Sequence, residues 1–392
     1  MPDVAIEFDP LSADFFDDPY ETYRRLRDEA PCYYSKRYGF WALCRYEDVV
    51  VAHRDWQTFT STKGITLDQL AQADIGSLAT GSIIFMDPPE HERLRRLVSR
   101  VFTPKAVADL EPMVRTLITG YLDPLVGEPA FDITADFAGP FPVEVICEIL
   151  GVPKGDRQQI RHWVDDMLHR EPGEAEVTQA GMEAGLNTIL YLLDLAKEKR
   201  KHPTPDMLSG LVDAGLSDEE IAGFGVLVAG AGSETVTKLV GGGAVLFDRN
   251  PGEWAKVLAD PAAALPGAVE EILRFWAPSQ YQGRRSTTAS EWHGVTIPED
   301  VPVLLLTGAA NRDERAYEDP DRFDIGRPPQ LSVGFGHGIH SCLGAALARL
   351  ESRVAFEEIA TRWPQYTVNE DGLRRVQMSN VAGYSNVPVT IP

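Results

Sequence analysis

The sequence lacks the features that would place it in a membrane or in an oxidising compartment. It contains no apolar run near the roughly 18 residues that a membrane span needs, and its first residues include no basic segment leading into an apolar one. Cysteine is also scarce, because Cys32, Cys44, Cys147 and Cys342 lie far apart and do not have the spacing of a disulfide framework. We therefore expect a soluble, cytoplasmic protein without a membrane span.

Positive charge is scarce as well. With 37 Lys and Arg against 59 Asp and Glu, the formal net charge is −22 at pH 7, which argues against broad binding to nucleic acids or anionic membranes. One local exception is the basic cluster of Arg93, Arg95, Arg96 and Arg100. This cluster is either a solvated helix face or a docking site for an acidic partner.

The 392 residues also lack linkers, repeats and low-complexity segments, so we expect one large domain over residues 1–392. Helical periodicity dominates between residues 91 and 275, while strand patterns are confined to short stretches, chiefly residues 290–306 and 374–391. The sequence thus predicts a mainly α fold with a minor antiparallel β part. A chain of this length can enclose a buried cofactor.

One predicted helix is much longer than the others. It begins at a capping box, residues 217–220, and its apolar pattern continues to about Phe247. At a rise of ~1.5 Å per residue it would be on the order of 45 Å long and cross the whole domain. Gly230 and Gly232 are poor helix residues, so we expect the helix to open between them.

The most informative segment is the ten-residue stretch FGHGIHSCLG at positions 335–344. It places Cys342 behind a glycine-rich loop and directly before a helical run, where free backbone N–H groups lower the pKa of a thiol. Gly336 and Gly338 allow the loop to turn tightly and to approach a flat ligand, and Phe335 can shield the sulfur from water. A soft thiolate with fixed N–H donors suits an iron centre.

Three other interpretations of this segment are weaker. Cys342 could be a small buried core residue, as many isolated cysteines are. His337, His340 and Cys342 could ligate zinc, but no CxxC or second His/Cys cluster supplies a fourth ligand. The alternating glycines of the loop match neither of the common phosphate-binding glycine patterns.

The stretch resembles the heme-binding loop of the cytochromes P450, without a departure from the family's pattern. The resemblance implies that Cys342 is the axial thiolate ligand to the iron of heme b, iron protoporphyrin IX, and that Phe335 and Gly336 contact this cofactor. Because further motifs follow in the family's order along the chain, it also implies the cytochrome P450 fold.

On the long predicted helix, residues 231–235 (AGSET) resemble the family's oxygen-activation motif. The resemblance assigns Thr235 to hydrogen-bond the O₂ that is activated, and Glu234 to relay protons from solvent. The family more often has Asp where this chain has Glu234. Taken alone, such a threonine more often bonds the carbonyl group four residues earlier in the helix.

The two propionates of heme need charge-assisted partners when they are buried. His91 and Arg95 lie one helical turn apart, and their segment resembles the family's propionate-binding helix. His340 resembles a further propionate donor. Arg284 resembles the remaining arginine, although a one-residue gap would exchange it with Arg285.

Glu271 and Arg274 stand three residues apart on one predicted helix face, where they can form an ion pair. They resemble the family's ExxR motif, which stabilises the cysteine side of the heme pocket. Arg312 or Arg322 could supply its third member.

The resemblance implies a bacterial-type, class I heme-thiolate monooxygenase that inserts one atom of O₂ into a medium or large, mostly apolar organic molecule. No flavin or nicotinamide fold is fused to this chain, so electrons should come from a separate ferredoxin-type donor with an NAD(P)H-dependent reductase. A peroxide-driven heme peroxygenase and a non-catalytic heme-binding sensor are the alternatives. We expect a monomer.

The substrate cavity is expected to combine apolar walls with a polar handle for the substrate. Gln280, Tyr281 and Tyr384 are the candidate handles. The walls are expected to come from residues 61–84, 165–185, 228–232, 279–283 and 380–384.

Overall fold

Helices form most of the structure, a computed structural model in which residues 6–72, 80–171, 173–328 and 332–392 are described. The α-helices are α1 Ala13–Asp17, α2 Tyr20–Glu29, α3 Tyr46–Arg54, α4 Leu67–Leu70, α5 Glu90–Val98, α6 Pro104–Asp109, α7 Glu111–Leu122, α8 Pro140–Leu150, α9 Arg157–Leu168, α10 Gln179–Lys201, α11 Met207–Asp213, α12 Asp218–Arg249, α13 Pro251–Ala259, α14 Pro261–Phe275, α15 Thr307–Ala310 and α16 Ala345–Arg362. The 3₁₀ and π turns are η2 Ile83–Phe85, η3 Ser99–Phe102, η4 Asp123–Leu125, η5 Ile133–Ala138, η6 Lys154–Asp156, η7 Gly338–His340 and η8 Glu370–Gly372. The predicted mainly α fold is confirmed.

Within the described residues, the strands form four small sheets. They are β1 Cys32–Ser35, β2 Phe40–Leu43, β3 Phe59–Thr60, β4 Ala130–Asp132, β5 Gln282–Ser286, β6 Ser290–Trp292, β7 Val295–Ile297, β8 Pro302–Leu305, β9 Thr367–Val368, β10 Arg374–Arg375, β11 Tyr384–Asn386 and β12 Pro388–Thr390. The largest sheet has the order β1-β2-β8-β5-β3, and the others are β4-β12-β9, β10-β11 and β6-β7.

Strand pairing is antiparallel, as predicted, with one exception. Strands β2 and β8 are parallel, and Trp41 lies opposite Val303 while Leu43 lies opposite Leu305. These side chains belong to a buried apolar cluster beneath the sheet. A parallel neighbour at this position needs a long connection between the two strands, and here the helical body of the chain provides it.

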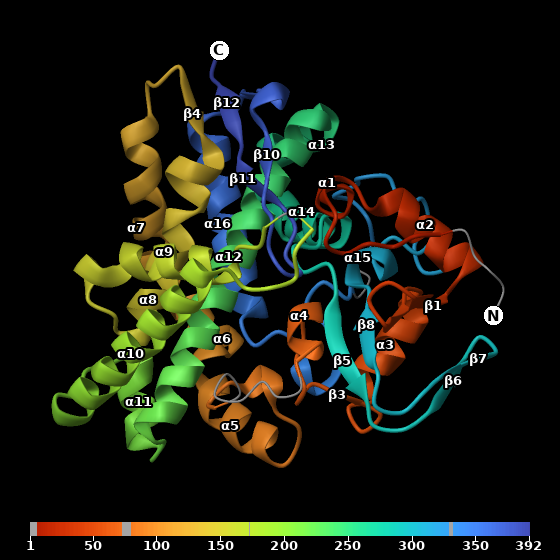
Figure 1. Cartoon of the computed structure of the whole chain (residues 1–392). Helices are drawn as coiled ribbons and strands as arrows, with labels where there is room; N and C mark the ends of the chain where they lie inside the picture. Colours follow the sequence, from red (N-terminus) through yellow and green to blue (C-terminus); the bar gives the residue numbers. More distant parts are fainter. Residues whose placement is uncertain (1–5, 73–79, 172, 329–331) are drawn as a thin grey trace.

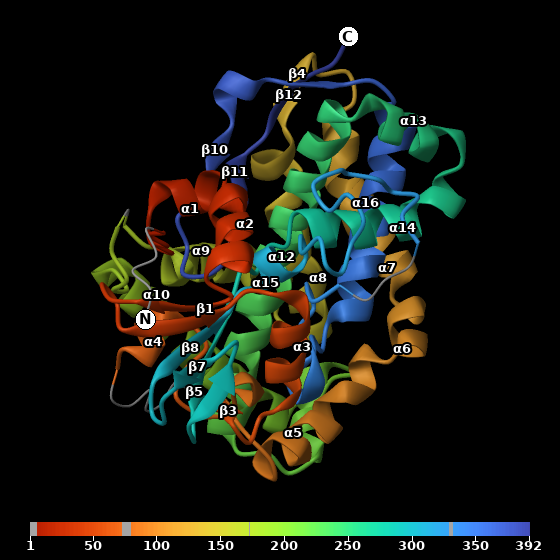
Figure 2. The ribbon, with the colours of Figure 1, turned by 90° about the vertical axis from the view of Figure 1, so that its right-hand side faces the viewer.

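Helix α12 runs through the centre of the molecule, between the helices α7–α11 and the five-stranded sheet (Figure 1). It packs against α8, α10 and α16. In the second view α14 and α16 lie beside α12 (Figure 2). The largest apolar cluster collects residues from all of these helices, so the core is built around α12.

The predicted capping box begins α12. The Ser217 hydroxyl accepts from the Glu220 N–H at 3.2 Å, and the Glu220 carboxylate accepts from the Ser217 N–H at 3.0 Å. The helix then continues through Gly230 and Gly232 without an interruption, so the predicted opening is wrong. A Cβ on Gly232 would stand 3.1 Å from the side chain of Ile146. This glycine therefore allows α8 to approach closely.

Residues 61–84 are one of the segments expected to line the cavity. The described part of this segment contains the short helix α4 and the turn η2, whereas residues 73–79 lie outside the described residues. Among the helices that are described, none combines the length and apolar character needed to cross a membrane.

Candidate functional site

Cys342 lies in a loop that turns sharply just before α16. The turns place Gly336 and Gly338 at φ angles of 64° and 68°, in the left-handed region that favours glycine. The Cys342 N–H donates to the Phe335 carbonyl oxygen at 2.8 Å, which fixes the cysteine within the loop. A Cβ on Gly338 would stand 2.4 Å from the carbonyl oxygen of His53, so the loop packs directly on the end of α3.

Cys342 lines a cavity, and its side chain is exposed to the open space there. Burial raises the pKa of Cys342, while the Gly344 N–H and the charges of Arg95 and Arg349 act in the opposite direction. The predicted lowering of this pKa is therefore wrong, because desolvation outweighs the three stabilising groups. A coordinated metal ion deprotonates a thiol outright, so a metal bound here would convert this side chain to a thiolate.

Helix α5 brings His91 and Arg95 to the same cavity. His91 is 1% exposed, and neither of its ring nitrogens has a hydrogen-bond partner among the described residues. Desolvation, with repulsion from His340 and Arg95, lowers the pKa of His91 to about 4. Arg95 donates to the Ser341 carbonyl oxygen at 2.7 Å, so α5 is held against the cysteine loop.

His340 and Arg284 reach the cavity from two other segments. The His340 ring meets the His91 ring edge to face with 4.6 Å between centroids, and its Nε2 lies 2.8 Å from the Ser61 hydroxyl. Arg284, on β5, is 4% exposed, and burial lowers its pKa to about 10. Arg285 instead points to the surface, where it forms an ion pair with Asp300 at 2.5 Å. Of the two arginines, Arg284 is the one at the cavity.

The cavity is rich in buried hydrogen-bond donors and poor in anions. The Arg284 guanidinium donates to the carbonyl oxygen of its own neighbour Gly283 at 2.7 Å. The nearby carboxylate of Asp87 is already engaged by Thr60 and lies 3.8 Å from His340. A flat ligand that carries carboxylates and a thiolate-binding metal would match this set of donors. Heme meets each requirement, so the residues present fit the cofactor that the sequence resemblance implies.

His53 is a cavity residue that sequence reasoning missed. It lies at the end of α3 and is 3% exposed, and neither ring nitrogen has a hydrogen-bond partner in the described part of the chain. Burial, with repulsion from Arg284 and His337, holds its pKa well below the usual value. No spacing in the sequence connects His53 with Cys342, because α3 packs on η7, which is almost 300 residues further along the chain.

Thr235 and Glu234 come from the middle of α12 but face different surroundings. Thr235 lines the cavity, and its hydroxyl donates to the Ala231 carbonyl oxygen at 3.0 Å. Glu234 is 5% exposed and forms an ion pair with Lys238 at 2.9 Å. It also contacts Asp165 of α9. The fold thus brings the hydroxyl to the cavity and places the acid on the side of α12 that faces α9.

Glu271 and Arg274 form a buried ion pair with two hydrogen bonds of 2.7 and 2.8 Å. The third member is Arg327, whose Nε lies 3.3 Å from a Glu271 carboxylate oxygen. The expectation of Arg312 or Arg322 is therefore wrong. Arg322 contributes a backbone carbonyl to Arg274, and Arg312 lies over the Tyr20 and Phe275 rings at 3.4 and 3.6 Å.

The Asn311 backbone carbonyl accepts from Arg274 at 2.9 Å, while its side chain accepts from the Val333 N–H at 2.8 Å. This residue connects the buried ion pair with the segment that leads into the cysteine loop. The Glu271–Arg274 ion pair, although distant from Cys342 in the sequence, therefore supports the position of Cys342.

The cavity next to Cys342 has a volume of about 280 Å³, and most of its walls are apolar. Residues of the expected segments 61–84, 228–232 and 279–283 line it, but within the described chain none from 165–185 or 380–384 does. The candidate handles are also wrong, since Tyr281 and Tyr384 are buried elsewhere and Gln280 bonds Tyr23. The apolar walls that the sequence did not predict are Phe102, Ile146, Phe224, Leu227, Val236 and Leu239.

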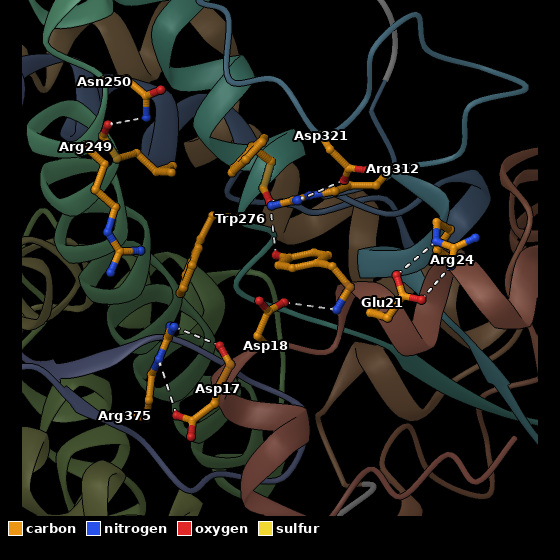
Figure 3. A pocket seen from close by; sticks show the side chains of 13 residues that line it. Asp17, Asp18, Glu21, Arg24, Arg249, Asn250, Trp276, Arg312, Asp321 and Arg375 are labelled. Carbon is orange, nitrogen blue, oxygen red and sulfur yellow. Dashed lines mark hydrogen bonds and ion pairs between the residues drawn. The ribbon is translucent and has the colours of Figure 1, made fainter.

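A larger cleft of about 710 Å³ lies apart from Cys342, between α2 and the ends of α12 and α14 (Figure 3). None of the candidate site residues described above lines it. Two of its arginines contact neighbouring residues: Arg375 donates to the Asp17 carbonyl oxygen at 2.8 Å, and Arg312 pairs with Asp321 at 3.1 Å. Size alone therefore does not mark the functional site.

Comparison with known proteins agrees with the geometry around Cys342. A family model described as Cytochrome P450 matches residues 264–371. A protein designated cytochrome P450 123, from Mycobacterium bovis and Mycobacterium tuberculosis, is 40% identical over 99% of this chain and 98% of its own. The erythromycin C-12 hydroxylase of Saccharopolyspora erythraea is 37% identical over 93% of this chain and 92% of its own.

Solved cytochrome P450 structures are also similar to this chain over nearly its whole length. CYP109E1 from Bacillus megaterium, in complex with testosterone, has a TM-score of 0.89 at 30% identity and covers 95% of this chain and 98% of that chain. A mutant of P450 EryK, in complex with erythromycin B, has a TM-score of 0.86 at 35% identity, and the match covers 95% of this chain and 95% of that chain. Since sequence identity and backbone agreement both extend over nearly the whole chain, the protein belongs to the cytochrome P450 family of heme-thiolate monooxygenases.

Proposed function

We propose that this P450 binds heme b through Cys342 and inserts one atom of O₂ into a medium or large, mostly apolar organic molecule, with electrons from a ferredoxin and its NAD(P)H-dependent reductase. The observation that carries the proposal is the meeting of Cys342, Thr235 and five cationic or donor side chains, namely His53, His91, Arg95, Arg284 and His340, at one apolar cavity. We further propose a single domain over residues 1–392 that acts as a cytoplasmic monomer.

The chain's own residues account for cofactor binding in this proposal. Cys342 would provide the thiolate ligand to the iron, with Phe335 and Gly336 as further contacts from the same loop. The propionates would be held by His91, Arg95, Arg284, His340 and the newly found His53. When bound, the heme supplies the iron centre at which O₂ is activated.

Proton delivery is assigned to the pair on α12. The Thr235 hydroxyl, which now donates to Ala231, has to turn toward the cavity in order to donate a proton there. Glu234 resupplies that proton from the side of the helix that faces α9. A peroxygenase or a heme sensor has no use for an acid and an alcohol at these positions, so their presence favours the monooxygenase.

The substrate class follows from the walls of the cavity. Ile65, Ile83, Phe224, Leu227 and Val228 present an apolar surface, which favours burial of an aliphatic or polycyclic skeleton. Two relatives of this chain are named after large, mostly apolar substrates: vitamin D(3) 25-hydroxylase and methyl-branched lipid omega-hydroxylase. Ser279, which also lines the cavity, is a candidate polar handle.

Thr235→Ala tests the proposed reaction. The variant should bind cofactor and substrate normally but lose product per NADH by at least about tenfold, because a positioned proton donor is removed. The reducing equivalents should appear as hydrogen peroxide. The measurement compares NADH consumed, peroxide released and product formed with a surrogate ferredoxin and reductase.

Thr237→Ala is the matched control. Its hydroxyl lies on the same helix but donates to the carbonyl oxygens of Ala138 and Ser233, away from the cavity. This variant should keep the wild-type ratio of product to NADH. An unchanged ratio in Thr235→Ala would contradict the assignment of Thr235.

The basic cluster on α5 is the proposed docking site for the electron donor. Arg95 holds the cysteine loop, and Arg93 pairs with Glu90 and Glu220, so Arg96 and Arg100 are the exposed members left for docking. The net charge of −22 would repel an acidic ferredoxin, and a local positive surface offsets this repulsion during approach.

Arg96→Glu should slow reduction by the donor severalfold at low salt and have less effect above about 0.1 M, where the screening length is ~10 Å. Stopped-flow reduction over a range of salt concentrations measures this. Arg374→Glu makes the same charge change on β10, at the opposite end of the molecule from α5 (Figure 1). Equal slowing in both variants would mean that overall charge, not docking on α5, controls the rate.

A further inference from the structure

Ser279 is a cavity residue that is held in place by two separate segments. It lies between α14 and β5, is half-buried, and lines the cavity of Cys342. Its backbone forms an antiparallel bridge with Val381, and the Ala382 N–H donates to the neighbouring Pro278 carbonyl oxygen at 2.8 Å. The position of the Ser279 side chain at the cavity wall is therefore fixed by the fold.

Two amide groups donate to the Ser279 hydroxyl oxygen. The Gln282 Nε2 lies 2.8 Å from this oxygen, and the Asn380 Nδ2 lies 3.1 Å from it. The orientation of Asn380 is fixed because its Nδ2 also lies 2.7 Å from the Tyr281 carbonyl oxygen, which can only accept. The Gln282 Oε1 accepts from the Thr307 hydroxyl at 2.5 Å, so the Nε2 of the same amide faces Ser279. Both amide neighbours of Ser279 are therefore donors.

This arrangement leaves the O–H of Ser279 unused. A hydroxyl oxygen has two acceptor lone pairs and one O–H donor, and the two amides occupy the acceptor positions. An amide NH₂ group cannot accept, so neither neighbour can take the O–H. Among the residues that the structure describes, no other acceptor engages it. Because Ser279 lines the cavity, its O–H is available to a molecule that binds there.

A neutral oxygen without a proton of its own is the partner that matches this donor. A bound hydrocarbon would leave the O–H unsatisfied, which is unfavourable. An alcohol could accept from Ser279, but its own O–H would then face walls that are mostly apolar. A carboxylate would be buried with a single hydroxyl as its donor, which does not offset the loss of its hydration.

We propose that this enzyme selects apolar molecules that carry a ketone, ester or lactone carbonyl, and that Ser279 determines this specificity by donating its O–H to the carbonyl oxygen. The inference rests on the proposed function, and it specifies the substrate class of the same cavity. The contact forms no covalent bond and transfers no proton, so Ser279 acts only in recognition of the substrate.

The test compares two bicyclic probes of nearly the same shape, 2-decalone, which has a ketone, and decalin, which has none. Equilibrium dialysis with the heme-containing protein gives the Kd of each probe for the wild type and for Ser279→Ala. The variant should bind 2-decalone roughly tenfold more weakly, the effect of losing one net hydrogen bond. It should bind decalin at least as tightly as the wild type does. Each probe is compared with itself, so the different hydration of the two probes cancels.

Two further variants separate the hydrogen bond from a general disturbance of the cavity. Ser279→Thr keeps the O–H and should bind 2-decalone nearly as tightly as the wild type. Ser286→Ala is the matched control on β5, because the Ser286 hydroxyl donates to the Pro298 carbonyl oxygen at 2.7 Å. This control should leave the Kd values of both probes unchanged.

Three results would overturn the inference: no measurable binding of 2-decalone to the wild type, unchanged binding of 2-decalone in Ser279→Ala, or an equal loss of binding for both probes in that variant. Failure of the proposed function has a different signature. The reduced carbonyl complex of the wild type would then lack the spectrum of thiolate ligation, whichever probe is bound.

Discussion

Cys342→His should abolish the strongly red-shifted Soret band of the reduced carbonyl complex and reduce NADH-driven oxidation to background. The red shift comes from thiolate ligation, and an imidazole ligand does not donate electron density as a thiolate does. The measurement is the reduced carbonyl spectrum at matched heme content, followed by product analysis.

Cys32→Ser provides the control for this prediction. Burial raises the pKa of Cys32 to about 12, so this thiol is inert, and it lies at the start of β1 rather than at the cavity. The control should retain the red-shifted band. A normal band in Cys342→His would rule out Cys342 as the ligand.

The second large effect is expected from Arg274→Met. This change leaves the Glu271 carboxylate buried at 3% exposure with Arg327 as its remaining cationic partner, and breaking a buried ion pair costs ~3–5 kcal/mol. The carbonyl groups of Asn311 and Pro320 also lose their donor. Denaturant unfolding should show this loss, and heme occupancy should fall with it.

The matched control is Arg25→Met on α2. Arg25 and Glu29 form an ion pair of 3.0 Å at the surface, with 37% and 46% exposure, and such pairs contribute only about 0–1 kcal/mol. If the two variants lose the same free energy of unfolding, burial of the Glu271–Arg274 pair has no special structural role.

Local chemistry explains what could be predicted from the sequence. The capping box at Ser217 and the apolar periodicity after it predicted α12 to within two residues, because both signals act within a few residues of each other. The spacing of His91 and Arg95 predicted a shared helix face, and the structure brings both to the cavity of Cys342.

Predictions that depended on distant neighbours were less successful. Gly232 was expected to open the helix. Its role instead depends on Ile146 of another helix, which can pack closely because Gly232 has no side chain. The choice of Arg327 over Arg312 depends on how residues 312–327 fold back on α14. The pKa of Cys342 depends on burial, which a motif does not encode. His53 was missed because its place at the cavity depends on how α3 packs on η7, which the sequence does not reveal.

The five-stranded sheet has a consequence for the synthesis of this protein. Strands β1, β2 and β3 come from residues 32–60, yet the strands between and beside them, β5 and β8, come from residues 282–305. A ribosome makes the first set long before the second. While the helical body is synthesised, β2 therefore lacks its neighbour β8, and β3 lacks its neighbour β5. Such non-local pairing slows folding and exposes strand edges to aggregation. The N-terminal strands are therefore the part of the nascent chain with the greatest need for a chaperone.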